Sequence, residues 1–132
     1  MTFATALFIA LGAAIGAPTR FVVDRYLNSA WPRGTLAVNL VGSFILGVAA
    51  GYALNASETP QLMLALVGVG FCGSLTTFGG FTAQAVDLFT LARAHSGASS
   101  RGAIGYVVGS ALGCVMAAWL GLAIALQIWP GS

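Results

Sequence analysis

Charged side chains are spaced so unevenly along this chain that they divide it into four long uncharged runs. The runs extend over residues 1–19, 34–57, 59–86 and 102–132. Each is at least about as long as the ~18 apolar residues that indicate a membrane-spanning helix. The spacing therefore predicts an all-α membrane protein with four transmembrane helices. The charges that separate the runs are Arg20, Asp24, Arg25, Arg33, Glu58, Asp87, Arg93 and Arg101.

Composition supports this class, since 58% of the residues are hydrophobic, 6% are charged and the mean hydropathy is +0.93. Soluble domains usually carry about 25% charged residues. A formal net charge of +2 offers no surface for nucleic acid. The first run has no basic residue before Arg20, which argues against a cleaved signal peptide. We expect one four-helix domain over residues 1–132, embedded in a lipid bilayer, with helices over about residues 3–27, 35–54, 59–92 and 102–129.

Residues 70–81, GFCGSLTTFGGF, combine an apolar setting with residues that weaken a helix. A continuous helix over residues 59–92 would be about 50 Å long, well beyond the ~30 Å hydrocarbon core. We therefore expect a break near residues 73–77. Broken helix at membrane depth needs protein or a polar cavity around it, and such breaks often hold ions or substrates. Inward-pointing carbonyl groups there would suit a desolvated alkali cation.

Polar residues inside the spans form two stripes at helical spacing. Asn39 and Ser43 share a face of the second helix, and Tyr106, Ser110 and Cys114 share a face of the fourth. A polar amide in an apolar span is costly without a partner. Asn39 therefore either bonds to a neighbouring helix or donates its amide N–H groups to a passing ligand. The hydroxyl groups of the fourth helix either bond to their own helix carbonyls or form a polar track beside a pore.

Small residues at four-residue spacing predict close helix packing. Gly12 and Gly16 form such a pair in the first helix. The fourth helix carries a longer stripe of small residues at Gly105, Gly109, Gly113, Ala117 and Gly121.

Cys72 and Cys114 lie in apolar segments without metal-ligand spacing, so we expect them to pack as small hydrophobic side chains.

Arg20 lies near the end of the first helix and has three possible roles. Its side chain can extend to the lipid headgroups. It can pair with Asp24, which follows four residues later on the same helix face. It can also anchor a vestibule that attracts an anion.

Three ordered motifs of this chain resemble the Fluc (CrcB) fluoride channels, over essentially its whole length. They are residues 16–21 (GAPTRF), 34–47 (GTLAVNLVGSFILG) and 70–81. The resemblance implies an antiparallel, dual-topology dimer with a structural sodium ion at its centre and two fluoride pores. It also implies a multi-pass protein of the bacterial plasma (inner) membrane that exports cytoplasmic fluoride passively and gives fluoride resistance.

The resemblance also implies roles for individual residues. The sodium ion would be held by the backbone carbonyls of Gly73 and Thr76, and Arg20 would lie in a vestibule. Aromatic rings carry a positive edge that can face an anion. Neutral amide donors bind an anion without holding it too tightly for conduction. The fluoride pore would be lined by Asn39, Ser43, Phe78, Phe81, Tyr106 and Ser110.

The chain departs from the usual family pattern at Ser74, at Gly79 and Gly80, and at Gln84, where glycine, Ser-Thr and glutamate are common. All five arginines also lie near the loops after the first and third helices. These features leave open a non-conducting subunit, or a heterodimer with a paired homologue in place of a homodimer.

Two other function classes are disfavoured. A small multidrug resistance-type transporter would need an intramembrane acidic residue, and the first helix has none before Asp24. An enzyme is not expected, because the lone His95 lies in a polar loop without a base–nucleophile set.

Overall fold

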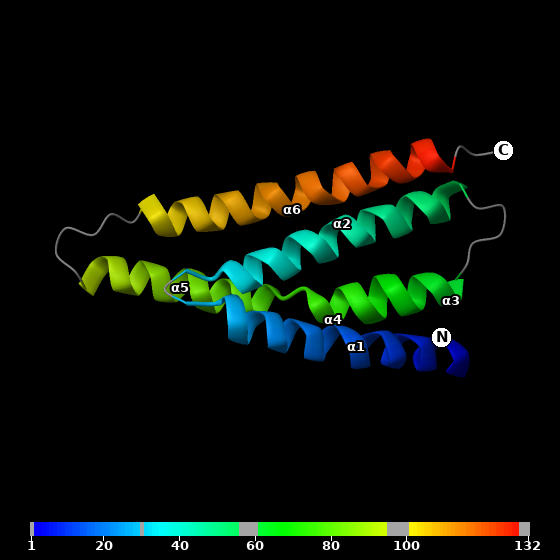
Figure 1. Cartoon of the computed structure of the whole chain (residues 1–132), viewed down its shortest axis with the longest axis horizontal. Coiled ribbons are helices and arrows are strands. Elements are labelled where there is room, and N and C mark those ends of the chain that lie inside the picture. Colours follow the sequence, from blue (N-terminus) through cyan, green and yellow to red (C-terminus); the bar gives the residue numbers. More distant parts are fainter. Residues whose placement is uncertain (1, 30, 56–60, 95–100, 130–132) are drawn as a thin grey trace.

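The fold consists of four long apolar helical segments arranged side by side (Figure 1). All four are long and apolar enough to cross a membrane, which confirms the predicted all-α membrane fold. The computed structural model describes residues 2–29, 31–55, 61–94 and 101–129. Three segments are continuous α-helices, α1 (Phe3–Leu27), α2 (Arg33–Asn55) and α6 (Arg101–Ile128).

The third segment is divided as the sequence predicts. It runs through α3 (Gln61–Met63), η1 (Leu64–Cys72) and α4 (Gly73–Leu75), and resumes as α5 (Phe78–Ala94). Thr76, between α4 and α5, has an extended backbone with φ −75° and ψ 154°. The break therefore lies at the C-terminal end of the predicted interval, at residues 76–77.

The segment η1 is a π-helix, which the apolar pattern does not predict. At its end the Gly73 N–H donates to the Gly68 carbonyl, five residues back. π-Helical turns are uncommon and occur often at functional sites. Glycines at positions 68 and 70 lie within this wider turn, directly before the break. The two irregularities therefore adjoin in one segment.

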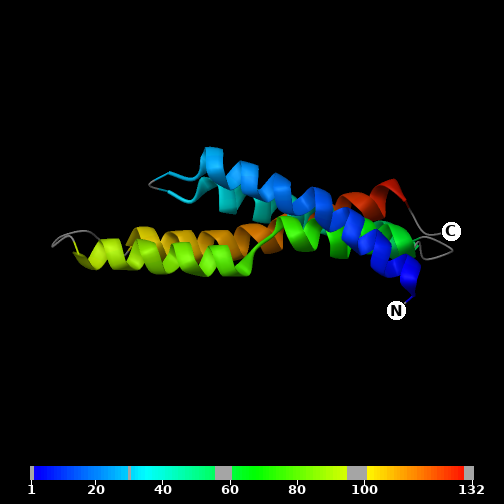
Figure 2. The ribbon, with the colours of Figure 1, turned by 90° about the horizontal axis from the view of Figure 1, so that it is seen from below.

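The break lets the third segment change its neighbours. Before it, η1 packs against α1 and α2, whereas after it α5 packs mainly against α6. Among the residues that the structure describes, α5 makes no contact with α1. Figure 2 shows the result, with the α5–α6 pair separated from the α1–α2 pair at one end of the molecule. The candidate site lies beside the break, where the third segment changes its neighbours.

Close backbone approach accounts for some of the predicted small residues. A Cβ at Gly12 would collide with the Leu66 carbonyl of η1, and one at Gly121 would collide with the Phe44 carbonyl of α2. Gly105 and Gly109 differ, since a Cβ at either would meet nothing within 4 Å among the described residues. The small stripe of α6 thus packs tightly within the subunit only towards its C-terminal end.

The connection between α1 and α2 contains a polar cluster rather than the possible Arg20–Asp24 pair. The Asp24 carboxylate accepts hydrogen bonds from Asn28 Nδ2 at 3.2 Å and from Thr35 Oγ1 at 3.1 Å. The Asn28 side-chain oxygen accepts the Gly34 N–H at 2.7 Å. The last of these bonds satisfies an N–H group in the first turn of α2, which has no acceptor within the helix.

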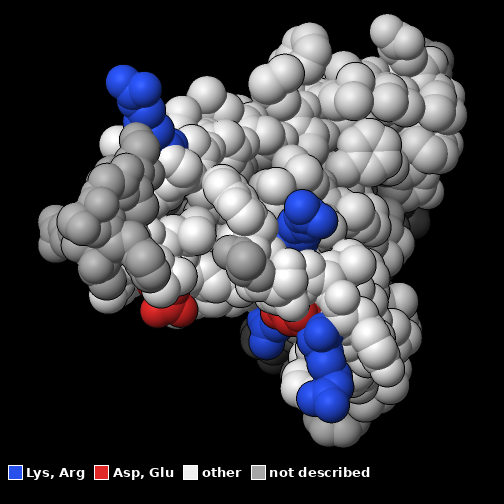
Figure 3. All heavy atoms as spheres, turned by 60° about the vertical axis from the view of Figure 1, so that its left-hand side comes forward, with Lys and Arg blue, Asp and Glu red and all other residues white. Residues whose placement is uncertain are grey.

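Charged side chains gather at the end of the molecule that carries the α1–α2 connection (Figure 3). Arg25, Arg33, Asp87 and Arg101 are all exposed. The opposite end holds the N-terminal end of α1 and the C-terminal end of α6 (Figure 1). Glu58, His95 and the side chain of Arg93 lie outside the described part of the structure, so the expectations about them stay predictions.

Candidate functional site

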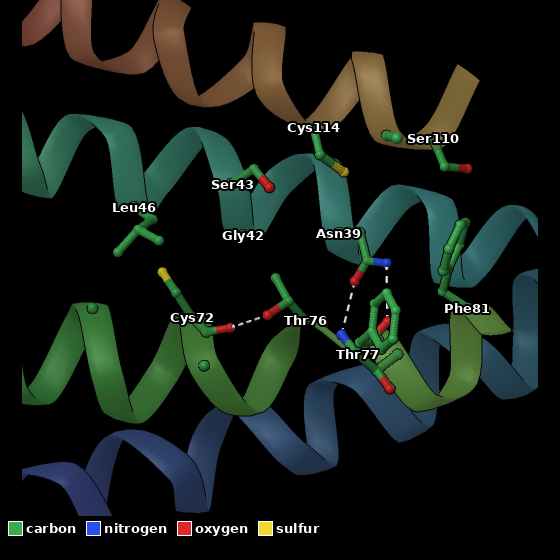
Figure 4. A pocket seen from close by; sticks show the side chains of 14 residues that line it. Asn39, Gly42, Ser43, Leu46, Cys72, Thr76, Thr77, Phe81, Ser110 and Cys114 are labelled. Atoms are coloured by element: carbon green, nitrogen blue, oxygen red, sulfur yellow. Dashed lines mark hydrogen bonds between the residues drawn. The ribbon is translucent and has the colours of Figure 1, made fainter. Parts of the chain in front are cut away.

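A groove of about 360 Å³ lies between α2, the broken third segment and α6. Figure 4 shows side chains from these elements pointing into the same space. The groove therefore brings together residues that are far apart in the sequence. Arg20 and Tyr106 lie outside its lining. The predicted site residues that line it are Asn39, Ser43, Gly73, Thr76, Phe78, Phe81 and Ser110.

Asn39 holds the break through its side-chain amide. Its Nδ2 donates to the Thr77 carbonyl at 3.2 Å, and its Oδ1 accepts the Thr77 N–H at 2.8 Å. In a continuous α-helix that N–H would donate to the carbonyl of Gly73, four residues earlier. Asn39 therefore removes the helical partner of the Gly73 carbonyl. The second Nδ2–H group of Asn39 stays available to a ligand in the groove.

Thr77 begins α5 and releases a second carbonyl. Its Oγ1 accepts the Gly80 N–H at 3.0 Å, which is the usual bond of a helix N-cap. In a continuous helix the Gly80 N–H would donate to Thr76. The carbonyls of Gly73 and Thr76, predicted from the resemblance as sodium ligands, are thus among those that lose helical donors at the break.

Neutral backbone oxygens are the cation ligands that this groove offers. Across the described stretches of the chain, no group of three or more His, Cys, Asp or Glu residues could hold a metal ion. Alkali cations are bound in channels by rings of backbone carbonyls. The donor set of the break therefore fits a sodium ion, and a transition metal would find no imidazole, carboxylate or thiolate cluster there.

Arg20 contacts the break from the side of α1. Its Nη1 donates to the Ser74 carbonyl at 2.9 Å and to the Thr76 carbonyl at 3.4 Å. The side chain is half-buried rather than extended to the end of the helix. This contact disfavours extension of the Arg20 side chain to the headgroups, whereas the vestibule role stays a prediction.

Aromatic rings continue the groove along α5. The ring centroids of Phe78 and Phe81 are 6.0 Å apart, and those of Phe81 and Tyr106 are 5.5 Å apart. Phe78 is 78% exposed in the single chain. Such a large exposed ring beside a groove requires either lipid or another protein surface to cover it. The rings thus form a row that begins at an uncovered edge of the groove.

The hydroxyl groups of α6 differ in their bonding. The Tyr106 hydroxyl donates to Gln84 Oε1 at 3.1 Å. Gln84 stands where a glutamate is common in the family that the chain resembles. The Ser110 side chain is buried, and its Oγ has no hydrogen-bond partner among the described residues. An unpaired hydroxyl group is costly to bury. Ser110 is therefore a member of the predicted polar track whose hydroxyl group is unpaired beside the groove.

Sequence reasoning did not identify two residues that shape this site. Thr77 was noted only as a helix-weakening residue, yet it binds Asn39 and caps α5. Cys72 was expected only to pack, yet it lines the groove and its carbonyl accepts the Thr76 hydroxyl at 2.9 Å. A threonine that directly precedes a resumed helix is itself an N-cap signal that could have identified Thr77.

Comparisons with known proteins agree over most of the chain. A family model described as "CrcB-like protein, Camphor Resistance (CrcB)" matches residues 7–122. The chain is 40% identical to "Fluoride-specific ion channel FluC 2" of Rhodococcus jostii, with 89% of this chain and 95% of that one covered. It is 41% identical to "Fluoride-specific ion channel FluC" of Bordetella petrii, over 90% of this chain and 89% of that one. The same name belongs to a Stutzerimonas stutzeri protein that is 38% identical, with 91% and 95% covered.

Proposed function

Because this chain belongs to the CrcB-like family and its relatives are fluoride-specific ion channels, we propose that it is a fluoride channel that exports the ion passively from the cytoplasm. It is a multi-pass membrane protein and not an enzyme. The bacterial inner membrane is the proposed location. A small multidrug resistance-type transporter is not supported by these relatives.

The observation that carries this proposal is the convergence of neutral donors and aromatic rings on one groove. Asn39, Ser43 and Ser110 supply polar groups without charge, and Phe78 and Phe81 supply ring edges. Fluoride is strongly hydrated, so close donors must offset its dehydration. A wall without fixed positive charge binds the anion weakly enough to release it, as conduction requires.

Passive export needs no further machinery in this chain. Fluoride enters cells as neutral HF and dissociates at cytoplasmic pH. A membrane potential of about 100 mV, negative inside, drives a monovalent anion outwards by about 2.3 kcal/mol. That free energy sustains roughly a fiftyfold concentration ratio across the membrane. An open, selective path is therefore sufficient to keep cytoplasmic fluoride low.

We propose that a second copy, inserted in the opposite orientation, covers the groove. The half-buried polar groups of Asn39 and Ser43 would otherwise face lipid, where polar groups lack partners. The exposed ring of Phe78 would be covered by the same contact. An antiparallel pair places two such grooves side by side, which supports the inference of two pores.

A heterodimer with a paired homologue is the second candidate arrangement, and the charge distribution favours it. Exposed arginines gather at one end of the molecule (Figure 3). By the positive-inside rule this end stays cytoplasmic and both termini lie outside. A chain with one preferred orientation would need a differently oriented homologue to form an antiparallel pair. In that case this chain alone would not conduct.

The structural sodium ion belongs to the same proposal. The carbonyls of Gly73 and Thr76 have lost their helical donors, and both residues line the groove. In an antiparallel pair, two copies of this break would supply four oxygens around the centre. The ion would stabilise the assembly and take no part in fluoride movement.

Fluoride efflux from liposomes that contain only this purified chain tests the function. The liposomes are loaded with potassium fluoride, and valinomycin supplies the counter-current while a fluoride electrode records release. We expect rapid fluoride release without chloride release from matched chloride-loaded liposomes. Chloride release at a similar rate would refute a fluoride-selective channel. No release from folded protein would refute a self-sufficient homodimeric channel, and release restored by a co-expressed homologue would establish the heterodimer.

Replacement of either ring tests the aromatic wall. We expect Phe78→Ile and Phe81→Ile each to lower fluoride efflux by about tenfold or more, because isoleucine keeps the apolar volume but has no ring edge. Phe81→Ile should have the larger effect, since Phe81 contacts both Phe78 and Tyr106. Phe89→Ile, further along α5, is the matched control. Unchanged efflux in both test variants would remove the rings from the path.

A further inference from the structure

We infer that Arg20 is a positioning residue for the cation site at the break, and that its guanidinium fixes the Thr76 carbonyl which the proposed sodium ion would share. This inference rests on the proposed function, because it concerns the structural ion of that channel. It goes beyond the expectation that Arg20 anchors a vestibule that attracts an anion. The observation behind it is the pair of bonds from Nη1 to the carbonyls of Ser74 and Thr76.

The approach of α1 to the break makes these bonds possible. A Cβ at Gly16 would lie 2.5 Å from the Phe71 carbonyl and would collide with the Ser74 side chain. The absence of a side chain at Gly16 thus brings the backbone of α1 against α4. Arg20 follows one helical turn later, and its long side chain then reaches the Ser74 carbonyl within α4 and the Thr76 carbonyl beyond its end.

The charge of Arg20 suits this position. The last carbonyls of a helix carry a partial negative charge and lack intrahelical donors. The chain runs as helix from Gln61 to Leu75 before the break, so its negative end is where Arg20 binds. An arginine in an apolar span normally extends to the headgroups. A half-buried Arg20 is instead stabilised by the carbonyls that it contacts.

The Thr76 carbonyl oxygen can bind both the Arg20 guanidinium and a sodium ion. A backbone carbonyl has two lone pairs, so the Thr76 oxygen can accept from Arg20 and still bind a metal ion. The 3.4 Å bond to this oxygen is long, whereas the 2.9 Å bond to Ser74 is short. Arg20 therefore anchors the backbone mainly through Ser74 and orients the Thr76 carbonyl without occupying it fully. Loss of the anchor would let this carbonyl rotate and weaken ion binding.

Sodium titration of the purified full-length chain tests this role separately from conduction. Thermal unfolding in detergent is recorded at rising sodium concentration, with N-methylglucamine holding the ionic strength constant. We expect Arg20→Gln to raise the sodium concentration for half-maximal stabilisation by about tenfold, as loss of one charge-assisted hydrogen bond would produce. Arg20→Lys should give a smaller rise, since an ammonium group is a point donor and cannot reproduce the planar guanidinium. Arg25→Gln removes the same charge from an exposed position of α1 and should leave the sodium dependence unchanged.

The outcomes separate this inference from the proposed function. An unchanged sodium midpoint in folded Arg20→Gln would overturn it, even if fluoride efflux fell through weaker anion attraction. If Arg20→Gln does not fold, Arg20→Lys decides, and a wild-type midpoint there would overturn it as well. A wild-type chain without any sodium-dependent stabilisation would overturn both the ion site and this role. Fluoride efflux from wild-type liposomes would still report on the channel itself.

Discussion

Asn39→Asp is expected to reduce fluoride efflux by roughly a hundredfold or more. Two negative charges about 4 Å apart repel by about 4 kcal/mol at an effective dielectric constant of 20. A carboxylate at this position would face the anion path in the groove. It would also place an oxygen against the Thr77 carbonyl, where Asn39 Nδ2 now donates at 3.2 Å. The added charge and the lost hydrogen bond should therefore both lower fluoride efflux.

A second variant separates these two causes. Asn39→Leu keeps a side chain branched at Cγ, although a bulkier one, and removes both bonds to Thr77 without adding charge. We expect it to lower efflux through a loosened break, but less than Asn39→Asp does. Ser43→Ala, one turn along the same face of α2, is the control for removal of a polar group from the groove. Efflux from Asn39→Asp at the wild-type rate in the liposome assay would exclude Asn39 from the path.

The spacing of charges was sufficient to predict the four spans, and helix-weakening residues were sufficient to predict the break. Both signals are local, because they depend on which residues are neighbours along the chain. The ends of the helices also depend on local signals, and within the described stretches they differ from the predicted ends by only a few residues. Hydrophobic periodicity could not distinguish the π-helix at η1 from an α-helix, since every side of that segment is apolar.

The bonds that shape the site connect residues too distant in sequence for such signals. Asn39 and Thr77 are separated by 38 positions, and Arg20 and Ser74 by 54. The sequence left Asn39 either as a bond between helices or as a ligand donor. The structure shows the bond between helices, and the second Nδ2–H group of Asn39 remains available to a ligand. The sequence also did not determine where the Arg20 side chain points, because this depends on how closely α1 approaches the break.

The stripe of small residues in α6 shows why equal spacing does not mean equal function. Gly121 lies against the backbone of α2, whereas Gly105 and Gly109 face open space in the single chain. The crossing of two straight helices brings their axes close over only a few turns. A regular sequence pattern therefore predicts a face that can pack, and the crossing point decides which of its residues do so within the subunit.

Gly12→Ala is expected to destabilise the chain by about 3 kcal/mol, at the upper end of what one added methyl group costs in a packed interior. A Cβ at Gly12 would collide with the Leu66 carbonyl and lie 2.7 Å from the Phe71 nitrogen. Both are backbone atoms of η1, so no side chain can rotate away to make room. The facing Gly70 is equally confined, because a Cβ there would lie 2.5 Å from the Ile9 carbonyl.

Gly105→Ala is the matched control for Gly12→Ala, since it adds the same methyl group to another helix where nothing lies within 4 Å among the described residues. We expect thermal unfolding of the purified chain in detergent to shift strongly for Gly12→Ala and little for Gly105→Ala. Equal unfolding temperatures for wild type and Gly12→Ala would contradict the close approach of α1 to η1. Because that approach also carries Arg20 to the break, the Gly12→Ala chain should lose sodium-dependent stabilisation together with its packing, which links the small residues of α1 to the ion site.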